Sequence, residues 1–75
     1  MMTTCTQAQA EDQVLAALSS VTGRIYPWDQ VSDAVDVYLC RIEREQGRPL
    51  DRSSLPQAVV LTVLDTIVRA ERADA

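Results

Sequence analysis

Histidine, phenylalanine, lysine and asparagine do not occur in this chain of 75 residues. Without histidine, neither a Ser-His-Asp triad nor a Cys-His pair can form, and the usual general base near neutral pH is missing. The commonest metal ligand is missing too, and the two cysteines, Cys5 and Cys40, are too far apart for a Cys-x-x-Cys site. The sequence therefore predicts a protein that is not an enzyme and that holds no metal or other cofactor.

Long apolar runs, which are needed to cross a membrane or to direct secretion, are also absent. No segment has the roughly 18 uninterrupted apolar residues of a membrane span, and the first residues lack the basic and apolar regions of a secretion signal. We therefore expect a cytoplasmic protein, in which Cys5 and Cys40 are free thiols. The missing lysine, asparagine and phenylalanine have codons rich in A and T at their first two positions, which favours a GC-rich and bacterial genome.

The charge of the chain is negative. The chain has eleven acidic and seven basic residues, and all the basic residues are arginine. This gives a formal net charge of −4 and a pI near 4.5. Such a charge disfavours nucleic acid and anionic membranes as partners. A domain this small buries only about 60% of its unfolded surface, so its stability is expected to be marginal unless a partner or a second copy assists.

The most apolar stretch runs from Ser54 to Arg72 and predicts the helix on which the rest of the chain packs. Ser54 is the expected N-cap, with Pro56 in the first turn; alternatively Leu55 is the cap, because a residue before proline avoids the α region. Helical spacing gives this segment two apolar seams. They are Val60, Val63, Ile67 and Ala70, and Leu61, Leu64 and Val68. Two seams imply two neighbouring helices; alternatively, one seam, or its edge at Val59, contacts a second chain.

Two narrower amphipathic segments precede it. The first should run from about Gln7 to Ser20, start at a capping box on Thr4 or Thr6, and stop at Gly23. Its expected apolar stripe is Ala10, Val14, Ala17, Leu18 and Val21. The second should begin with Pro27 in its first position and end at Gly47. Its expected stripe is Trp28, Val31, Val35, Tyr38, Leu39 and Ile42.

These segments predict an all-α fold, a small antiparallel three-helix bundle with the C-terminal helix at its centre. The whole chain, residues 1–75, forms one domain. The connection at 47–53 carries a glycine, a proline and alternating charges, which is typical of a loop. Residues 1–5 and 72–75 are expected to fray.

Three residues are candidate contacts for a protein partner: Tyr26, Trp28 and Val59. Trp28 shares a stripe with Val35, so we expect it to plug one end of the core. The alternative is that Tyr26 and Trp28 are partly exposed and form a recognition hot spot. A second feature is an acidic ridge of Asp29, Asp33 and Asp36. Their negative charges are expected to interact favourably with the helix dipole on an exposed face. Alternatively, they bind an arginine-rich partner.

Four arginines, Arg41, Arg44, Arg48 and Arg52, gather around the second connection. Together with the amides of residues 53–54 at a helix start, they could bind an anion. Interleaved acidic residues favour a solvated surface of mixed charge instead. The connection is also longer than the turn of a DNA-binding helix-turn-helix motif.

The acidity, the length and the run Asp33-Ala34-Val35-Asp36 with Glu43-Arg44-Glu45 loosely resemble acyl and peptidyl carrier proteins, over about half of the chain. Those carriers attach phosphopantetheine to a serine directly after an aspartate at the start of the corresponding helix. Here Gln30 and Val31 occupy that register and Ser32 follows valine, so the decisive motif is absent and membership does not follow.

The predicted function is that of a non-enzymatic module that binds a protein partner or associates with itself. Two alternatives remain at this point. One is a carrier-like protein that bears a group on Ser32. The other is a small nucleic-acid-binding regulator that uses the four arginines.

Overall fold

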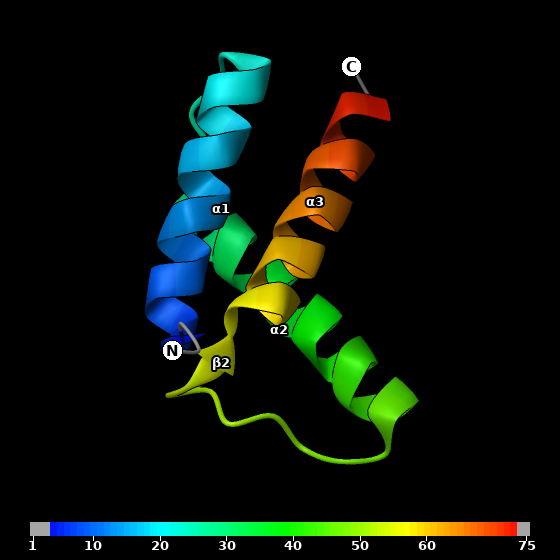
Figure 1. Cartoon of the computed structure of the whole chain (residues 1–75). Coiled ribbons are helices and arrows are strands. Elements are labelled where there is room, and N and C mark those ends of the chain that lie inside the picture. The colour runs from blue at the N-terminus through cyan, green and yellow to red at the C-terminus, as the bar shows by residue number, and fades with distance from the viewer. Residues whose placement is uncertain (1–3, 74–75) are drawn as a thin grey trace.

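Three α-helices make up most of the computed structural model, which describes residues 4–73. They are α1 (Gln7–Thr22), α2 (Trp28–Gln46) and α3 (Gln57–Ala73). In Figure 1, α1 and α3 lie side by side and run in the same direction, and α2 crosses behind them in the opposite sense. The predicted antiparallel three-helix bundle is therefore confirmed, with α3 packed against both other helices and most extensively against α1.

Local sequence fixes the ends of the first two helices. Thr6 forms the capping box with Gln9: the amide of Gln9 donates to Thr6 Oγ1 over 3.2 Å, and the amide of Thr6 donates to Gln9 Oε1 over 2.9 Å. Gly23 and Gly47 follow α1 and α2 at φ of 71° and 72°, a left-handed conformation that favours glycine. The predicted stop signals are thus confirmed, and Thr6 rather than Thr4 is the cap. Pro27 is the N-cap of α2, so this helix begins at Trp28, one residue later than expected.

The core is aliphatic and lies where the three helices meet. Each helix contributes a short buried stripe, and one residue of each strand adds to it. The largest fully buried side chains are Val14, Val31, Val35, Leu39, Leu55 and Val60. On α3, Val60, Val63 and Ile67 of the first predicted seam are buried, whereas Ala70 is exposed. In the second seam Leu64 and Val68 are half-buried and Leu61 is 53% exposed, so the covered face of α3 is narrower than predicted.

A two-stranded sheet, which was not expected, joins the start of the chain to the start of α3. β1 (Thr4–Cys5) pairs antiparallel with β2 (Leu55–Pro56), with Cys5 opposite Leu55. The amide of Gln7 also donates to the carbonyl of Arg52 over 2.8 Å. The proposed Ser54 cap and a first turn containing Pro56 are therefore wrong. Leu55 is fully buried, and this burial holds the backbone extended until α3 begins at Gln57.

The ends of the chain are more ordered than the sequence indicated. Thr4 is paired in β1, Cys5 is buried, and α3 continues through Arg72 to Ala73. These positions were predicted to fray, and the structure places them in regular secondary structure. The rest of the predicted frayed ends, residues 1–3 and 74–75, lie outside the described residues. Within residues 4–73, no helix combines the length and the apolar character needed to cross a membrane.

Candidate functional site

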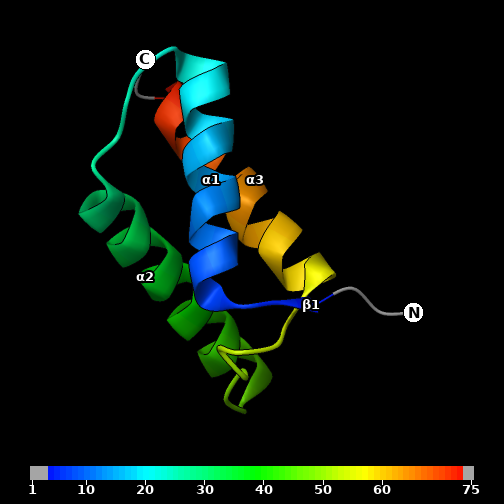
Figure 2. The ribbon, with the colours of Figure 1, turned by 90° about the vertical axis from the view of Figure 1, so that its left-hand side faces the viewer.

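The connector between α1 and α2, residues 23–27, is an extended segment held at several points. Figure 2 shows it leaving the end of α1 and descending to the start of α2. The hydroxyl of Thr22 donates to the carbonyl of Leu18 over 2.7 Å and accepts the amide of Arg24 over 3.2 Å. The hydroxyl of Tyr26 donates to Glu71 Oε2 over 3.3 Å, which ties the connector to the last turns of α3. These hydrogen bonds give the connector a defined conformation.

Trp28 does not plug the core as predicted. It is 53% exposed, because it is the first residue of α2 and the buried stripe of that helix begins one turn later at Val31. Tyr26 is the aromatic residue packed against the core at this end of the bundle, and it is half-buried. The two aromatic residues therefore have different environments, and only Trp28 presents most of its ring to solvent.

Three apolar side chains are exposed at this end of the molecule, and we call them the connector patch: Val21, Ile25 and Trp28. Ile25 is 95% exposed, and Val21 is 48% exposed although it was predicted to face the core. Val21 lies in the last turn of α1, beyond Leu18, the last buried residue of its stripe. Burying such side chains against a partner is favourable by roughly 25 cal/mol for each Å² of apolar surface removed from water.

A shallow hollow of about 230 Å³ adjoins the connector patch. Its lining is Val21, Thr22, Arg24, Tyr26, Glu71 and Arg72. Val21 is the residue common to both features, and Ile25 lies in the chain between Arg24 and Tyr26 of the lining. Glu71 accepts the hydroxyl of Tyr26, whereas Arg24 and Arg72 form no ion pair with any residue of the described range 4–73. The hollow is thus a locally basic surface on an acidic protein.

Val59, the third candidate contact, lies elsewhere. It is half-buried in the first turn of α3 and packs against the core. Tyr26 contacts Glu71 near the other end of the same helix, and at 1.5 Å of rise per residue Val59 and Glu71 are about 18 Å apart along the axis. Tyr26 and Trp28 therefore lie at the same end of the molecule, whereas Val59 lies near the other end of α3.

The three residues of the acidic ridge share one exposed face of α2. Asp29, Asp33 and Asp36 are separated by four and three positions, which places them in a row at helical spacing. Asp36 lies 3.6 Å from the guanidinium of Arg52, so part of its charge is balanced. Asp29 and Asp33 have no such partner among residues 4–73, and Asp29 lies in the first turn, where a negative charge is stabilised by the helix dipole.

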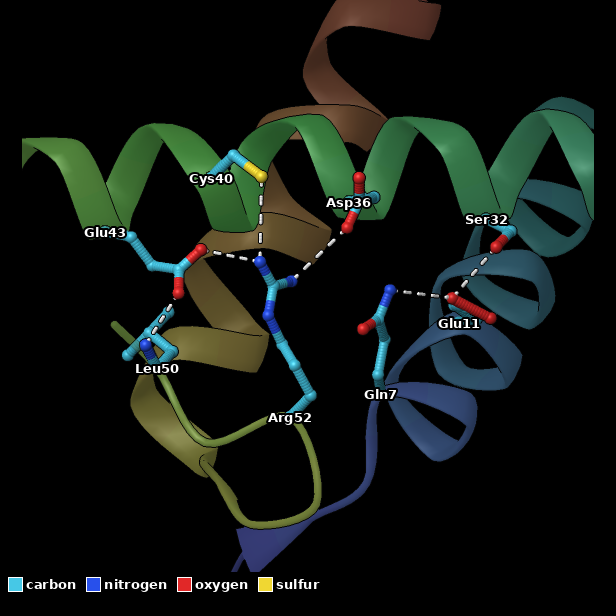
Figure 3. Close-up of polar contacts among 8 residues, drawn as sticks. All are labelled: Gln7, Glu11, Ser32, Asp36, Cys40, Glu43, Leu50 and Arg52. Carbon is cyan, nitrogen blue, oxygen red and sulfur yellow. Dashed lines mark hydrogen bonds and ion pairs between the residues drawn. The ribbon is translucent and has the colours of Figure 1, made fainter. Parts of the chain in front are cut away.

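Arg52 is the centre of a polar cluster that sequence reasoning treated as part of a solvated surface. Its Nη2 lies 2.6 Å from Glu43 Oε1 and donates to Cys40 Sγ over 3.6 Å, and Glu43 Oε2 accepts the amide of Leu50 over 2.8 Å (Figure 3). This cluster folds the connection between α2 and β2 against α2. Because Arg52 is engaged there, the four arginines do not converge on one anion site.

The amides proposed to hold an anion are occupied as well. The amide of Ser53 donates to Asp51 Oδ1 over 3.0 Å, and the amide of Ser54 donates to the Asp51 carbonyl over 3.1 Å. Neither belongs to a helix start, since α3 begins only at Gln57. Of the remaining arginines, Arg41 lies over the ring of Tyr38, 5.2 Å from its centroid.

Asp51 provides a prediction on proton binding. The hydroxyl and the amide of Ser53 both donate to its carboxyl group, and these bonds lower the pKa of Asp51 below its ordinary value of 3.8. Since the folded protein favours the ionised form, this group stabilises the fold above the unfolded pKa, and that contribution is lost as the pH falls through the lowered value. We expect an NMR titration to give Asp51 a midpoint below 3.8, and S53A to move it upward. An unchanged midpoint in S53A would contradict the turn geometry.

A second polar cluster joins α1 to α2 at Glu11, which is 96% buried. Its Oε2 accepts Gln7 Nε2 over 3.2 Å and the hydroxyl of Ser32 over 3.1 Å (Figure 3). Sequence reasoning missed this contact, although a signal existed. Glu11 stands three and seven positions before the buried Val14 and Leu18, and therefore on the same face of α1. Ser32 is half-buried in the second turn of α2, with its hydroxyl engaged by Glu11.

The two cysteines are free thiols, as predicted, in different surroundings. Cys5 is buried in β1, and Cys40 is exposed on α2. In the part of the chain that the structure describes, no group of three or more cysteine, aspartate or glutamate side chains is placed to hold a metal ion. Comparison of the chain with protein-family models, curated proteins and solved structures gave no match.

Proposed function

We propose that this chain is a non-enzymatic protein-binding module that contacts its partner through the connector patch. The observation that carries the proposal is the 95% exposure of Ile25, a large aliphatic side chain, close in the chain to a half-exposed tryptophan. Tryptophan is among the residues enriched at binding hot spots. Single exposed apolar side chains are ordinary on protein surfaces, whereas several in one region indicate a contact site, and three of them fall within residues 21–28.

Hydrogen bonds on either side of Ile25 support this function. The amide of Arg24 donates to Thr22 and the hydroxyl of Tyr26 donates to Glu71, so the backbone that carries Ile25 is ordered in the free protein. A surface that is ordered in advance loses less conformational entropy on binding.

The free state of both cysteines agrees with a reducing compartment, and we propose a cytoplasmic location on that basis.

We expect the substitution I25D to abolish capture of a specific partner by the immobilised protein, and W28A to weaken it at least about tenfold, because each removes an apolar contact from the interface. The matched control is L61D. Leu61 is as exposed as Trp28 but lies on α3, away from the connector. Capture from a lysate, followed by titration of each purified candidate, measures these effects.

Trp28 supplies an independent readout, since it is the only tryptophan. Its fluorescence should be that of a solvated indole in the free protein and should shift to the blue when a purified partner covers it. Sedimentation of the isolated protein tests self-association with the same variants. The proposal fails if every captured protein binds I25D as well as it binds the wild type, and if Trp28 emission stays unchanged in complexes.

A further inference from the structure

The connector hollow adds a charge requirement to the proposed protein-binding function, on which this inference depends. Two arginines, Arg24 and Arg72, and one acidic residue, Glu71, line the hollow, and neither arginine is in an ion pair within residues 4–73. Guanidinium groups bind carboxylates through paired, charge-assisted hydrogen bonds. We propose that the partner presents a short acidic segment whose carboxylate enters this hollow while an adjacent large apolar side chain covers Ile25 and Trp28.

The size of the hollow favours a side chain over a small metabolite. Its volume of about 230 Å³ is below the roughly 300 to 1,000 Å³ of typical small-molecule sites. The hollow and the connector patch share Val21, and Ile25 directly follows Arg24 of the lining in the chain. A segment of several residues is therefore required to reach from the hollow to Ile25, which a small metabolite does not do.

The extent of the surface favours a linear segment over a second copy of this chain. A standard interface between folded domains uses about 20 to 30 residues from each partner. The connector patch has three exposed apolar side chains, and the hollow adds the two arginines. The charge argument points the same way, because the protein as a whole has a net charge of −4 and its basic groups here attract a partner of the opposite sign.

A library of random peptides displayed on phage, selected on the immobilised full-length protein, tests this inference. We expect the selected peptides to be enriched in aspartate or glutamate next to a large apolar residue. Fluorescence polarisation with the best synthetic peptide should show affinity at least about tenfold lower for R24Q/R72Q, since this variant removes the charge-assisted hydrogen bonds to the peptide carboxylate. The binding should also weaken steeply with added salt.

The control R44Q/R48Q removes the same charge at the far end of α2 and should change the affinity by less than about twofold. Peptides that bind R24Q/R72Q as well as the wild type, yet lose binding to I25D, would overturn the acidic segment and leave the protein-binding function intact. If no selected peptide depends on Ile25 or Trp28, both proposals fail. Sedimentation showing a dimer that R24Q/R72Q disrupts would replace the peptide with a second copy as the occupant.

Discussion

Replacing Leu55 with alanine is expected to lower the free energy of unfolding by about 2 to 5 kcal/mol, the usual cost of removing a buried leucine side chain. Leu55 is fully buried at the point where β2 meets the core. The total stability of a domain of 75 residues is about 4 to 11 kcal/mol, so this loss is a large part of it. Urea denaturation followed by far-ultraviolet circular dichroism measures the change.

The matched control for Leu55 is L61A, which makes the same chemical change at a position that is 53% exposed. We expect it to cost no more than about 1 kcal/mol, because little apolar surface returns to water. Equal effects of L55A and L61A would show that Leu55 is not part of the core. Such a result would also remove the reason for the extended backbone before α3.

The second large effect concerns the ion pair between Arg52 and Glu43. We expect R52M and E43Q each to cost about 1 to 3 kcal/mol, since both groups are mostly buried and each loses a charge-assisted hydrogen bond. A double-mutant cycle should give a coupling free energy of about 0.5 to 3 kcal/mol. Urea denaturation of the four proteins in the cycle measures it.

The pair of Asp65 and Arg69 is the internal comparison for this cycle. Their groups are 3.1 Å apart, four positions apart on α3, and both side chains are well exposed. Exposed pairs of this kind couple by about 0.3 to 0.5 kcal/mol. A coupling for Arg52 and Glu43 no larger than that value would mean that the cluster does not hold the connection against α2.

The helices were predictable because each carries its own local information. The capping box at Thr6, the glycines at 23 and 47, and the spacing of Val31, Val35 and Leu39 together specify where α1 and α2 lie and which face is covered. The three-helix arrangement follows from these faces, since each apolar stripe must be buried against a neighbour.

The β1 and β2 pair was not predictable in the same way. A strand of two residues shows no alternation, and the signal at residues 54–57 fits a helix start equally well. The contact between residues 5 and 55 is tertiary, and the extended conformation is favoured by three factors together: the pairing with β1, the burial of Leu55, and Pro56, which disfavours helical angles at Leu55. Trp28 was misplaced for a related reason: periodicity gives the face of a helix but not the point along it where the neighbouring helix ends.

The candidate site was predictable only in part. Tyr26 and Trp28 were singled out because the chain has few aromatic residues. Tyr26 lies in the connector and Trp28 directly follows it. Ile25 and Val21 carry no distinguishing pattern, and the meeting of Arg24 with Arg72 depends on how α3 packs beside α1. The spacing of residues within one segment cannot show which residues of a distant segment lie beside it.

The pairing of Thr4 and Cys5 with residues 55 and 56 has a consequence for synthesis of the protein. β1 and α1 precede their partners β2 and α3 by about 50 residues of chain. During synthesis, Val14 and Leu18 of α1 therefore lack one of their packing surfaces until α3 has been made. The bundle closes only when these distant segments meet, a non-local step that slows folding.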